Sequence, residues 1–368
     1  MIEVLCVTTK LHVGGVQTFL KNFAPVLIRK GVRYNFAVQT DEKQPYDDYF
    51  SDLGCRIFHI SSMTDSKYRF IKDLYDLLKA HPEIKIIHSH LNFANVYSLA
   101  AAKLAGVKVR ISHAHSSYEA KSFFDFLRKQ FMHLVGWRIV ATDYWACSDN
   151  AALWLYGNSG KSRVIKNAIN LSEYKFDIKK RNEYRQKYQI ENDFVWIHVG
   201  SFSKSKNHQF LLNLFSEFLK EHKNSKLILC GDGGERKTIE QQIDCLGIKN
   251  AVVLLGNVNN CQDYLCASDV FVFPSMFEGF PLSVIEAEAT GLPCVVSKAV
   301  PDDAICCGNV YKIPMFCIKD WLDAIQKVYD EKPGERENGV ERIKNSALDL
   351  DSEGGKLAEL YISTLKRK

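Results

Sequence analysis

Two glutamates near residue 280 are the clearest candidates for chemistry in this sequence. Glu278 lies in a polar loop, and Glu286 follows after seven intervening residues, in the second turn of an expected helix. Pro281 favours the start of that helix, because its fixed φ suits the first helical position and its missing N–H needs no partner there. Gly291, with Pro293 just beyond it, favours the helix end. A lone Glu286 would usually be a solvated surface residue, but two acceptors in one loop and helix suit the vicinal hydroxyls of a ribose and a sugar.

The same stretch predicts an anion site. Residues 269–273 form a short run of apolar, β-branched and aromatic side chains that is typical of a buried strand, and residues 292–296 form the next one. The loop after the first strand faces the N-terminus of the following helix. Unsatisfied N–H groups and the helix dipole favour phosphate there. The two carboxylates must therefore serve another part of the ligand.

Two further strand-to-helix loops suit a phosphorylated ligand. Lys206 follows an expected strand at 195–199, where its charge can meet phosphate oxygens. Gly14 and Gly15 follow the first expected strand, at 1–9, and would let the backbone come close to a ligand. Their spacing differs from GxGxxG, which weighs against a nicotinamide cofactor. A solvated lysine and a simple tight turn are the ordinary alternatives for these two loops.

Four histidines end two neighbouring expected strands, where an α/β sheet keeps its chemistry: His88, His90, His113 and His115. They invite a zinc interpretation, but no cysteine or carboxylate is spaced along the chain to complete a site, so we expect no metal. Residues 349–351 spell a DxD motif just before the last expected helix. Aspartate is an ordinary N-cap at such a position, and we assign no metal to it either.

Strands and helices alternate along both halves of the chain. Expected strands lie at 1–9, 34–39, 56–60, 84–88, 107–112 and 143–147, and then at 195–199, 226–230, 252–255, 269–273 and 292–296. This order predicts parallel sheets with helices on both faces. Because 368 residues exceed the size at which a single core stops growing, we expect two doubly wound domains.

The bulk composition is that of an ordinary globular protein, with 46% apolar and 25% charged residues and a mild net charge of +5. Charges interrupt the apolar runs well before about 18 residues, so no membrane span is expected. The N-terminus reads as a strand and lacks the features of a signal peptide. The cysteine count of 11 is odd, without a CxxC pair, which indicates thiols in a reducing compartment. We therefore expect a cytoplasmic protein.

Residues 121–141 form the most amphipathic stretch, with aromatic side chains among four basic ones: Lys121, Arg128, Lys129 and Arg138. A basic helix of this kind suits an anionic membrane interface. A core-facing helix with a solvated basic side has much the same pattern. Both interpretations stay open.

The stretch from Glu278 to Glu286 resembles the Glu-x7-Glu motif of retaining glycosyltransferases of family 4 (glycosyl transferases group 1), of the exopolysaccharide and capsule type. The resemblance implies a GT-B fold, with two Rossmann-like, doubly wound parallel-sheet domains and a cleft between them. It implies an acceptor domain at 1–168, on which a C-terminal helix at about 352–368 packs back, and a nucleotide-sugar donor domain at 169–351. Residues 166–170, Lys-Asn-Ala-Ile-Asn, resemble the family's interdomain turn with three replacements.

The resemblance also implies roles for single residues. Glu286 would hold the ribose hydroxyls, and Glu278 would hold the sugar together with the backbone at Gly279, Phe280 and Pro281. His115 would contact the donor sugar, with His113 as the second choice. Lys206, Gly15 and the amides of Leu282 and Ser283 would stabilise the diphosphate as charge builds on the leaving group. Glu278, His115 and Lys206 are thus the expected catalytic residues. The expected donor-binding set comprises Gly14, Gly15, Ser201, Lys206, Gly231, Val258, Glu278, Gly279, Phe280, Pro281, Leu282, Ser283 and Glu286.

Two positions depart from the family pattern. Ser201 stands where the family usually has an Arg after the Gly, and Gln17 stands where it often has Glu. A Lys206 point charge without its Arg partner should hold a diphosphate less firmly, although Lys204 lies in the same loop. The departure at Ser201 therefore predicts a lower donor affinity.

We therefore expect a retaining hexosyltransferase that takes a sugar from a nucleotide-sugar, with UDP-sugar as the leading candidate, and needs no cofactor and no metal. The expected acceptor is a glycan or a polyprenyl-linked glycan, which would bring the protein to the inner face of an anionic membrane; no nucleic acid is expected as partner. Two alternatives stay open. One is a UDP-sugar 2-epimerase on the same fold, and the other is a non-catalytic sugar-nucleotide-binding partner of another transferase.

Overall fold

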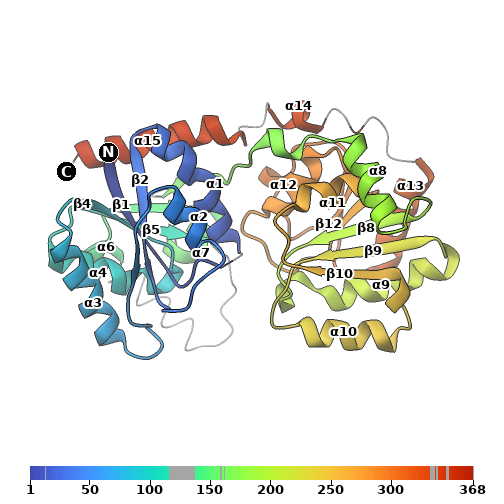
Figure 1. Cartoon of the computed structure of the whole chain (residues 1–368), viewed down its shortest axis with the longest axis horizontal. Helices are drawn as coiled ribbons and strands as arrows, with labels where there is room; N and C mark the ends of the chain where they lie inside the picture. Colours follow the sequence, from blue (N-terminus) through green and yellow to red (C-terminus); the bar gives the residue numbers. More distant parts are fainter. Residues whose placement is uncertain are drawn as a thin grey trace. The chain divides into compact units, whose positions relative to one another are not determined.

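The computed structural model describes residues 1–12, 14–115, 137–157, 160, 162–331, 336, 339–344 and 348–367. The chain folds into two compact units. One consists of Met1–Ala168 with Leu350–Lys368, and the other of Ile169–Asp349. Each unit has its own parallel sheet with helices on both faces, as Figure 1 shows. The doubly wound α/β architecture predicted from the strand and helix alternation is confirmed.

The first unit contains a seven-stranded sheet in the order β3-β2-β1-β4-β5-β6-β7. Every paired strand in it is parallel. The strands are β1 (Ile2–Thr8), β2 (Val32–Val38), β3 (Ile57–His59), β4 (Ile84–Ser89), β5 (Val109–Ala114), β6 (Asp143–Ala146) and β7 (Arg163–Val164). The strand order reverses at β1 and β4, and ligands of open α/β sheets bind beyond the carboxyl ends of the strands at such a point.

Helices cover both faces of this sheet. One face packs on α1 (Gly15–Arg29), α2 (Asp47–Asp52) and α15 (Leu350–Lys366). The other packs on α3 (Lys67–Ala80), α4 (Asn95–Ala105) and the short α6 (Trp137–Val140). A 3-10 turn (Asn92–Ala94) precedes α4, and α7 (Asp149–Tyr156) follows β6. Both faces are apolar because the buried strands are rich in Val, Ile and Leu throughout rather than alternating with polar residues.

The last helix, α15, returns to the first unit and lies along α1 (Figure 1). Its Tyr361 is fully buried, and the phenol oxygens of Tyr361 and Tyr34 are 3.2 Å apart. At the helix start, Asp351 forms an ion pair with Arg29. The second aspartate of the DxD sequence therefore has a structural partner.

The second unit contains a six-stranded parallel sheet in the order β10-β9-β8-β11-β12-β13. The strands are β8 (Phe194–Val199), β9 (Ser225–Cys230), β10 (Val252–Gly256), β11 (Val270–Phe273), β12 (Cys294–Ser297) and β13 (Val310–Ile313). The helices are α8 (Ile178–Lys187), α9 (His208–Glu221), α10 (Arg236–Cys245), α11 (Cys261–Ala267), α12 (Leu282–Ala289), α13 (Ile318–Glu331) and α14 (Gly339–Lys344). The core of one face brings α9, α10 and α13 against the sheet.

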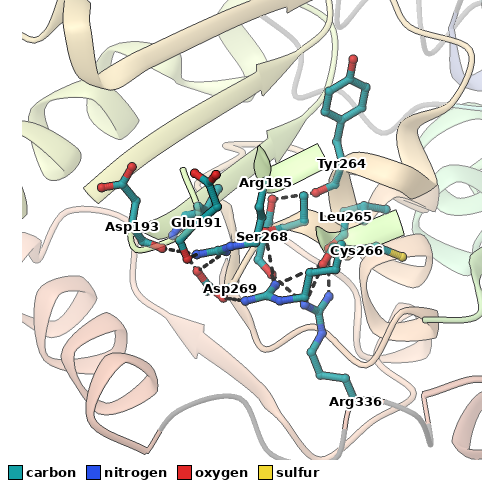
Figure 2. Close-up of polar contacts among 12 residues, drawn as sticks. Arg185, Glu191, Asp193, Tyr264, Leu265, Cys266, Ser268, Asp269 and Arg336 are labelled. Carbon is teal, nitrogen blue, oxygen red and sulfur yellow. Dashed lines mark hydrogen bonds and ion pairs between the residues drawn. The ribbon is translucent and has the colours of Figure 1, made fainter. Parts of the chain in front are cut away.

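A cluster of buried arginines fastens α8 to the start of β11. Arg181 and Arg185 form ion pairs with Asp269 at 2.5 and 3.1 Å, and Asp269 also accepts the Val195 backbone N–H. Arg336 donates to the carbonyls of residues 265, 266 and 268 (Figure 2). These carbonyls end α11, where the helix dipole favours positive charge. These three arginines therefore hold the start of β11 in place, and the loop with Glu278 follows the other end of this strand.

Within the described part of the chain, none of the helices combines the length and the apolar character needed to span a bilayer. Residues 116–136, which include most of the amphipathic stretch, lie outside the described residues.

Candidate functional site

The loop between β11 and α12 has the predicted construction. Pro281 is the N-cap residue, one position before the first helical residue, so its predicted place at the first helical position was wrong by one residue. No side chain caps the helix, and its first turn carries no acidic residue. The helix ends at Ala289, and Gly291 follows in a left-handed conformation with a φ of 68°. First-turn N–H groups have no partner inside a helix, so the amides of Leu282 and Ser283 suit an anion.

Lys206 and Glu278 lie in direct contact, although 71 residues separate them in the sequence. The Lys206 Nζ donates to Glu278 Oε1 at 2.5 Å, and the Ser275 hydroxyl also donates to this oxygen. Both charged side chains are largely buried, with exposed fractions of 17% and 9%. The Nζ also lies 4.6 Å from the ring centre of Phe273, at the end of β11. Two predicted catalytic residues thus form one charge-neutral pair.

Backbone contacts hold the Lys206 loop against the Glu278 loop. Lys206 ends a 3-10 turn (Lys204–Lys206), and the Ser205 carbonyl accepts the Met276 N–H at 2.7 Å and the Ser275 hydroxyl at 3.0 Å. Ser275 therefore contacts Glu278 and the turn that carries Lys206. The sequence analysis did not identify Ser275, because its role depends on a contact with a loop far away in the chain.

Glu286 lies on α12 and is buried, with an exposed fraction of 8%. The phenol of Tyr174 donates a hydrogen bond to its carboxylate, and burial together with that negative charge raises the pKa of Tyr174 well above its usual value. Tyr174 belongs to the 3-10 turn Leu171–Tyr174, which packs against α12. A hydrogen bond with Cys230 and burial raise the pKa of the Cys261 thiol, and the negative charge of Glu286 adds to this rise. Glu286 is therefore oriented by uncharged groups. No local sequence signal pointed to Tyr174.

The loops that follow β8, β9 and β10 are joined at their backbones. Gly231 has a φ of 143°, and a Cβ there would lie 2.0 Å from the Gly200 carbonyl oxygen. Its N–H donates to the Gly256 carbonyl at 2.8 Å. Gly231 is therefore required for the close approach of these loops. Val258 follows as a half-buried side chain, and Ser201 is exposed, with its hydroxyl 3.3 Å from that of Ser203.

The remaining residues of the predicted set lie close to Glu278 in the chain. Gly279 and Ser283 are half-buried, and Phe280, Pro281 and Leu282 are buried. They all belong to the second unit, as do Glu278, Glu286, Lys206, Ser201, Gly231 and Val258. Leu282, Ser283 and Glu286 lie in α12, and the others lie in segments that follow the carboxyl ends of the strands.

The first unit holds the Gly14–Gly15 loop at the N-terminus of α1. Gly14 is the N-cap, and the first turn has neither a capping side chain nor an acidic residue. Gly15 is exposed, and a Cβ there would meet nothing within 4 Å, so the helix N-terminus is open to a ligand. Gln17 is buried, and its Nε2 donates to the Lys10 carbonyl at 2.8 Å. Gln17 therefore stabilises the Gly14–Gly15 loop through a hydrogen bond to its backbone and is not exposed to a ligand.

The four histidines form one cluster beneath α1. His88 Nε2 lies 3.0 Å from His113 Nδ1, and His90 Nδ1 lies 2.7 Å from His115 Nε2. His88, His90 and His113 are buried, whereas His115 is half-buried. Burial lowers the pKa of all four imidazoles, that of His115 to about 3, so they are neutral near pH 7. His115 is thus the member of the cluster with access to solvent.

The cluster also includes the Cys6 thiol. Ligand atoms of Cys6, His88 and His90 lie within 4.8 Å of one another, and so do those of His90, His113 and His115. The sequence analysis found no cysteine spaced to complete a site. Cys6 was missed because it comes from β1, where it pairs in register with His88, and such a register is not visible in local spacing.

Solved structures show which fold this is. HepE of Anabaena, solved with UDP and glucose, superposes with a TM-score of 0.82 at 18% identity over 99% of this chain and 100% of that one. WaaG, a glycosyltransferase involved in lipopolysaccharide biosynthesis, gives 0.71 at 18% identity over 98% and 99%. These are GT-B glycosyltransferases, and the predicted GT-B fold is confirmed.

Known sequences show the family. Residues 13–173 match the model of Glycosyltransferase Family 4, and residues 180–345 match that of Glycosyl transferases group 1. EpsF of Bacillus subtilis (strain 168), which is named as a glycosyltransferase, is 28% identical over 99% of this chain and 97% of its own length. A UDP-Gal:alpha-D-GlcNAc-diphosphoundecaprenol alpha-1,3-galactosyltransferase of Escherichia coli is 26% identical over 79% of each chain. The capsular polysaccharide biosynthesis glycosyltransferase CapH of Staphylococcus aureus is 24% identical over 99% of each. This chain therefore belongs to the glycosyltransferases of the family 4 and group 1 type.

Proposed function

We propose that this glycosyltransferase moves a sugar from a UDP-sugar to a glycan or lipid-linked glycan acceptor in cell-surface polysaccharide synthesis, with retention of the anomeric configuration. The observation that carries the proposal is the Lys206–Glu278 pair beside the uncapped N-terminus of α12, with Glu286 on the same helix. Such a site offers positive groups for a diphosphate and acceptors for two sets of hydroxyls. The UDP bound to HepE and the names of the bacterial relatives support this choice of donor and pathway.

In this proposal, Glu286 accepts hydrogen bonds from the ribose hydroxyls, and the phenol of Tyr174 holds its carboxylate in place. The amides of Leu282 and Ser283 bind the diphosphate, and Lys206 adds a charged donor. Glu278 accepts from the sugar hydroxyls while it orients Lys206. Each group thus binds one part of the donor. The residue that binds the diphosphate, Lys206, and the residue that binds the sugar hydroxyls, Glu278, are joined by one salt bridge.

During transfer, the bond between the anomeric carbon and the phosphate oxygen breaks, and a bond to the acceptor oxygen forms. The acceptor proton leaves with the nucleoside diphosphate. Negative charge grows on the leaving phosphate, and preorganised donors contribute most to the rate at such a place. Lys206 and the α12 N-terminus supply this positive charge, so the proposed reaction needs no metal ion. His115 and the Gly14–Gly15 loop are assigned to the donor sugar and diphosphate as further contacts.

The proposed acceptor is a glycan or a lipid-linked glycan. The relative from Escherichia coli is named for an acceptor on diphosphoundecaprenol, and such a lipid carries its sugar at a membrane surface. We assign the basic stretch at 121–141, most of which lies outside the described residues, to contact with anionic headgroups.

The test is incubation of the protein with UDP-sugars and a lipid-linked or soluble glycan acceptor, followed by separation of nucleotides and glycans. The proposal predicts UDP release that depends on the acceptor and a glycan lengthened by one sugar. A new UDP-sugar without UDP release would identify a 2-epimerase instead. Binding of UDP-sugar without any product, across a full panel of donors and acceptors, would identify a non-catalytic partner of another transferase.

A further inference from the structure

Three histidine side chains converge on one point in the first unit. His113 and His115 are two residues apart at the end of β5, so they project from the same face of the sheet. His90 immediately follows β4, the neighbouring strand. Ligand nitrogens of the three residues lie within 4.8 Å of one another. The ring of Phe19 from α1 packs edge-on against His113 and His115, with centroid distances of 5.5 and 5.9 Å.

Two nitrogens of this triad are buried and lack a hydrogen-bond partner among the described residues: His90 Nε2 and His113 Nε2. A buried polar atom without a partner costs free energy comparable with that of a lost hydrogen bond. Each exposed fraction is small, 4% for His90 and 0% for His113. The unmet His113 Nε2 therefore suits a ligand rather than bulk water, whereas His90 would bind an ion through Nδ1, which now contacts His115.

A chain of hydrogen bonds begins at His113 Nδ1 and leaves His113 Nε2 outside it. The His88 ring lies between His113 and Tyr361, with His88 Nδ1 2.5 Å from the Tyr361 oxygen, and Tyr34 continues the chain. With the proton on His113 Nδ1, this group donates to His88 Nε2, and His88 Nδ1–H donates to Tyr361. The lone pair of His113 Nε2 then points away from the chain. Metal-binding histidines almost always use their second nitrogen in this way.

We propose that His90, His113 and His115 form a binding site for a divalent transition-metal ion, with Zn²⁺ as the best-matched ion. Three imidazoles and one open position are a known zinc shell, whereas Mg²⁺ and Ca²⁺ require oxygen ligands that this triad does not offer. The ion reaches the site beside His115, the half-buried member. The site shares His115 with the proposed donor site, and the ion is not required for transfer.

Zn²⁺ fits after a small movement. Two nitrogens bound at about 2.0–2.1 Å in a tetrahedral shell are roughly 3.3 Å apart, whereas His90 Nδ1 and His115 Nε2 are now 2.7 Å apart. Opening this one pair therefore takes well under 1 Å, and the nitrogen of His113 lies within 4.8 Å of both. The alternative group of Cys6, His88 and His90 suits an ion less well. Both nitrogens of His88 are engaged, and burial raises the pKa of the Cys6 thiol, so the thiolate that would bind a metal is disfavoured.

One consequence follows if the proposed function also holds. His115 is assigned to the donor sugar, so an ion held by its Nε2 removes that contact. Zn²⁺ would then inhibit transfer. Binding of the ion itself is independent of this consequence, and it is measured without substrate.

The direct test is titration of the chelator-treated full chain with Co²⁺, followed by visible absorption, and then displacement by Zn²⁺. The proposal predicts one ion per chain and the intense d–d bands of tetrahedral Co²⁺. Either His113→Gln or His115→Gln should weaken binding by at least tenfold. Tyr361→Phe, which changes no ligand, should weaken it by roughly tenfold, the lower end for loss of such an orienting partner. His59→Gln removes an exposed histidine of the same unit and should change nothing.

The thermal transition of each variant without metal shows whether it folds. If His113→Gln does not fold, binding is compared between the parent, His115→Gln and Tyr361→Phe. Absence of the d–d bands in the parent protein would overturn the proposal. Equal affinity in the parent and the two triad variants would do so as well. Thiolate-bound Co²⁺ would give a near-ultraviolet charge-transfer band. If this band appears and Cys6→Ser removes it, the ion is bound by Cys6, His88 and His90, which would contradict binding by the three histidines.

Discussion

At the scale of single residues, the site depends on contacts that orient charged groups. Tyr174 is the clearest case, because it comes from a 3-10 turn outside the Glu-x7-Glu stretch and yet donates to Glu286. Tyr174→Phe removes this donor and keeps the ring. We expect UDP affinity to fall about fivefold, as for the loss of roughly 1 kcal/mol from one hydrogen bond. Isothermal calorimetry measures it, with Tyr188→Phe, which loses a hydroxyl that faces Tyr264 at 3.0 Å, as the control. Equal effects of the two variants would contradict the role of Tyr174.

Ser201, which the family resemblance aligns with an arginine expected to bind phosphate, is exposed. Ser201→Arg should therefore find room and add charged hydrogen bonds to the diphosphate. We expect UDP-sugar binding to tighten by about 1–3 kcal/mol. Calorimetry of both proteins, with circular dichroism as the check of folding, measures this. Unchanged or weaker binding by the folded variant would show that another group already serves the phosphate.

Glu288 provides a pH test of the fold around α12. It is fully buried; the Cys306 N–H donates to its Oε2 at 2.8 Å, and burial raises its pKa to about 7. A carboxyl group whose pKa is higher in the folded protein than in the unfolded chain favours the fold at low pH. This contribution is fully present below the unfolded pKa of about 4.5 and is lost as the pH rises through the folded pKa of about 7. We expect the free energy of unfolding to fall by about 3 kcal/mol from this group between pH 5 and pH 8.

The comparison is a series of urea unfolding curves at several pH values for the parent protein and Glu288→Gln. The variant should have a flatter dependence above pH 5 and a higher stability at pH 8. Glu217→Gln, at a partly exposed ion pair on α9, is the control and should keep the slope of the parent. The same slope in Glu288→Gln as in the parent would show that Glu288 does not titrate in this range.

At the scale of elements, strong local patterns were enough to predict most strands. The apolar, β-branched runs that became β8, β9 and β11 lie where they were expected, because their burial on both faces makes them continuous. Charged segments were harder. Residues 175–187 are charged and poor in apolar periodicity, as a linker or a peripheral helix would be, yet Arg181 and Arg185 of α8 form ion pairs with Asp269. A buried arginine resembles a solvated one in sequence until its partner is known.

The amphipathic stretch at 121–141 gives a prediction at this scale. A triple variant, Lys121→Ser with Arg128→Ser and Lys129→Ser, should lose most binding to vesicles that contain anionic lipid, because each cation contributes roughly 1 kcal/mol near such a surface. Co-sedimentation at low and physiological salt measures the binding. Vesicles of neutral lipid are the control. If the parent protein does not bind anionic vesicles, this stretch is an ordinary helix that packs on the core.

At the scale of the whole molecule, each unit places its candidate residues beyond the carboxyl ends of its strands. Strand and helix alternation was sufficient to predict two such units, because a parallel sheet needs a crossover helix after each strand. Two kinds of contact were not predictable. Cys6 joins the histidines through the register of β1 with β4, and Lys206 meets Glu278 through the order of β8 and β11 in the sheet. Both depend on pairings between strands that are distant in the sequence.

Paired measurements on Glu286→Ala and Glu278→Ala test most directly whether Glu286 binds the nucleotide and Glu278 binds the donor sugar. UDP affinity is measured by calorimetry, and transfer by UDP release in the presence of acceptor. Glu286→Ala should weaken UDP binding. Glu278→Ala should leave UDP binding nearly intact, because Lys206 stays available to the diphosphate, and should lower transfer. Two variants that bind UDP and turn over like the parent would contradict the placement of the donor site.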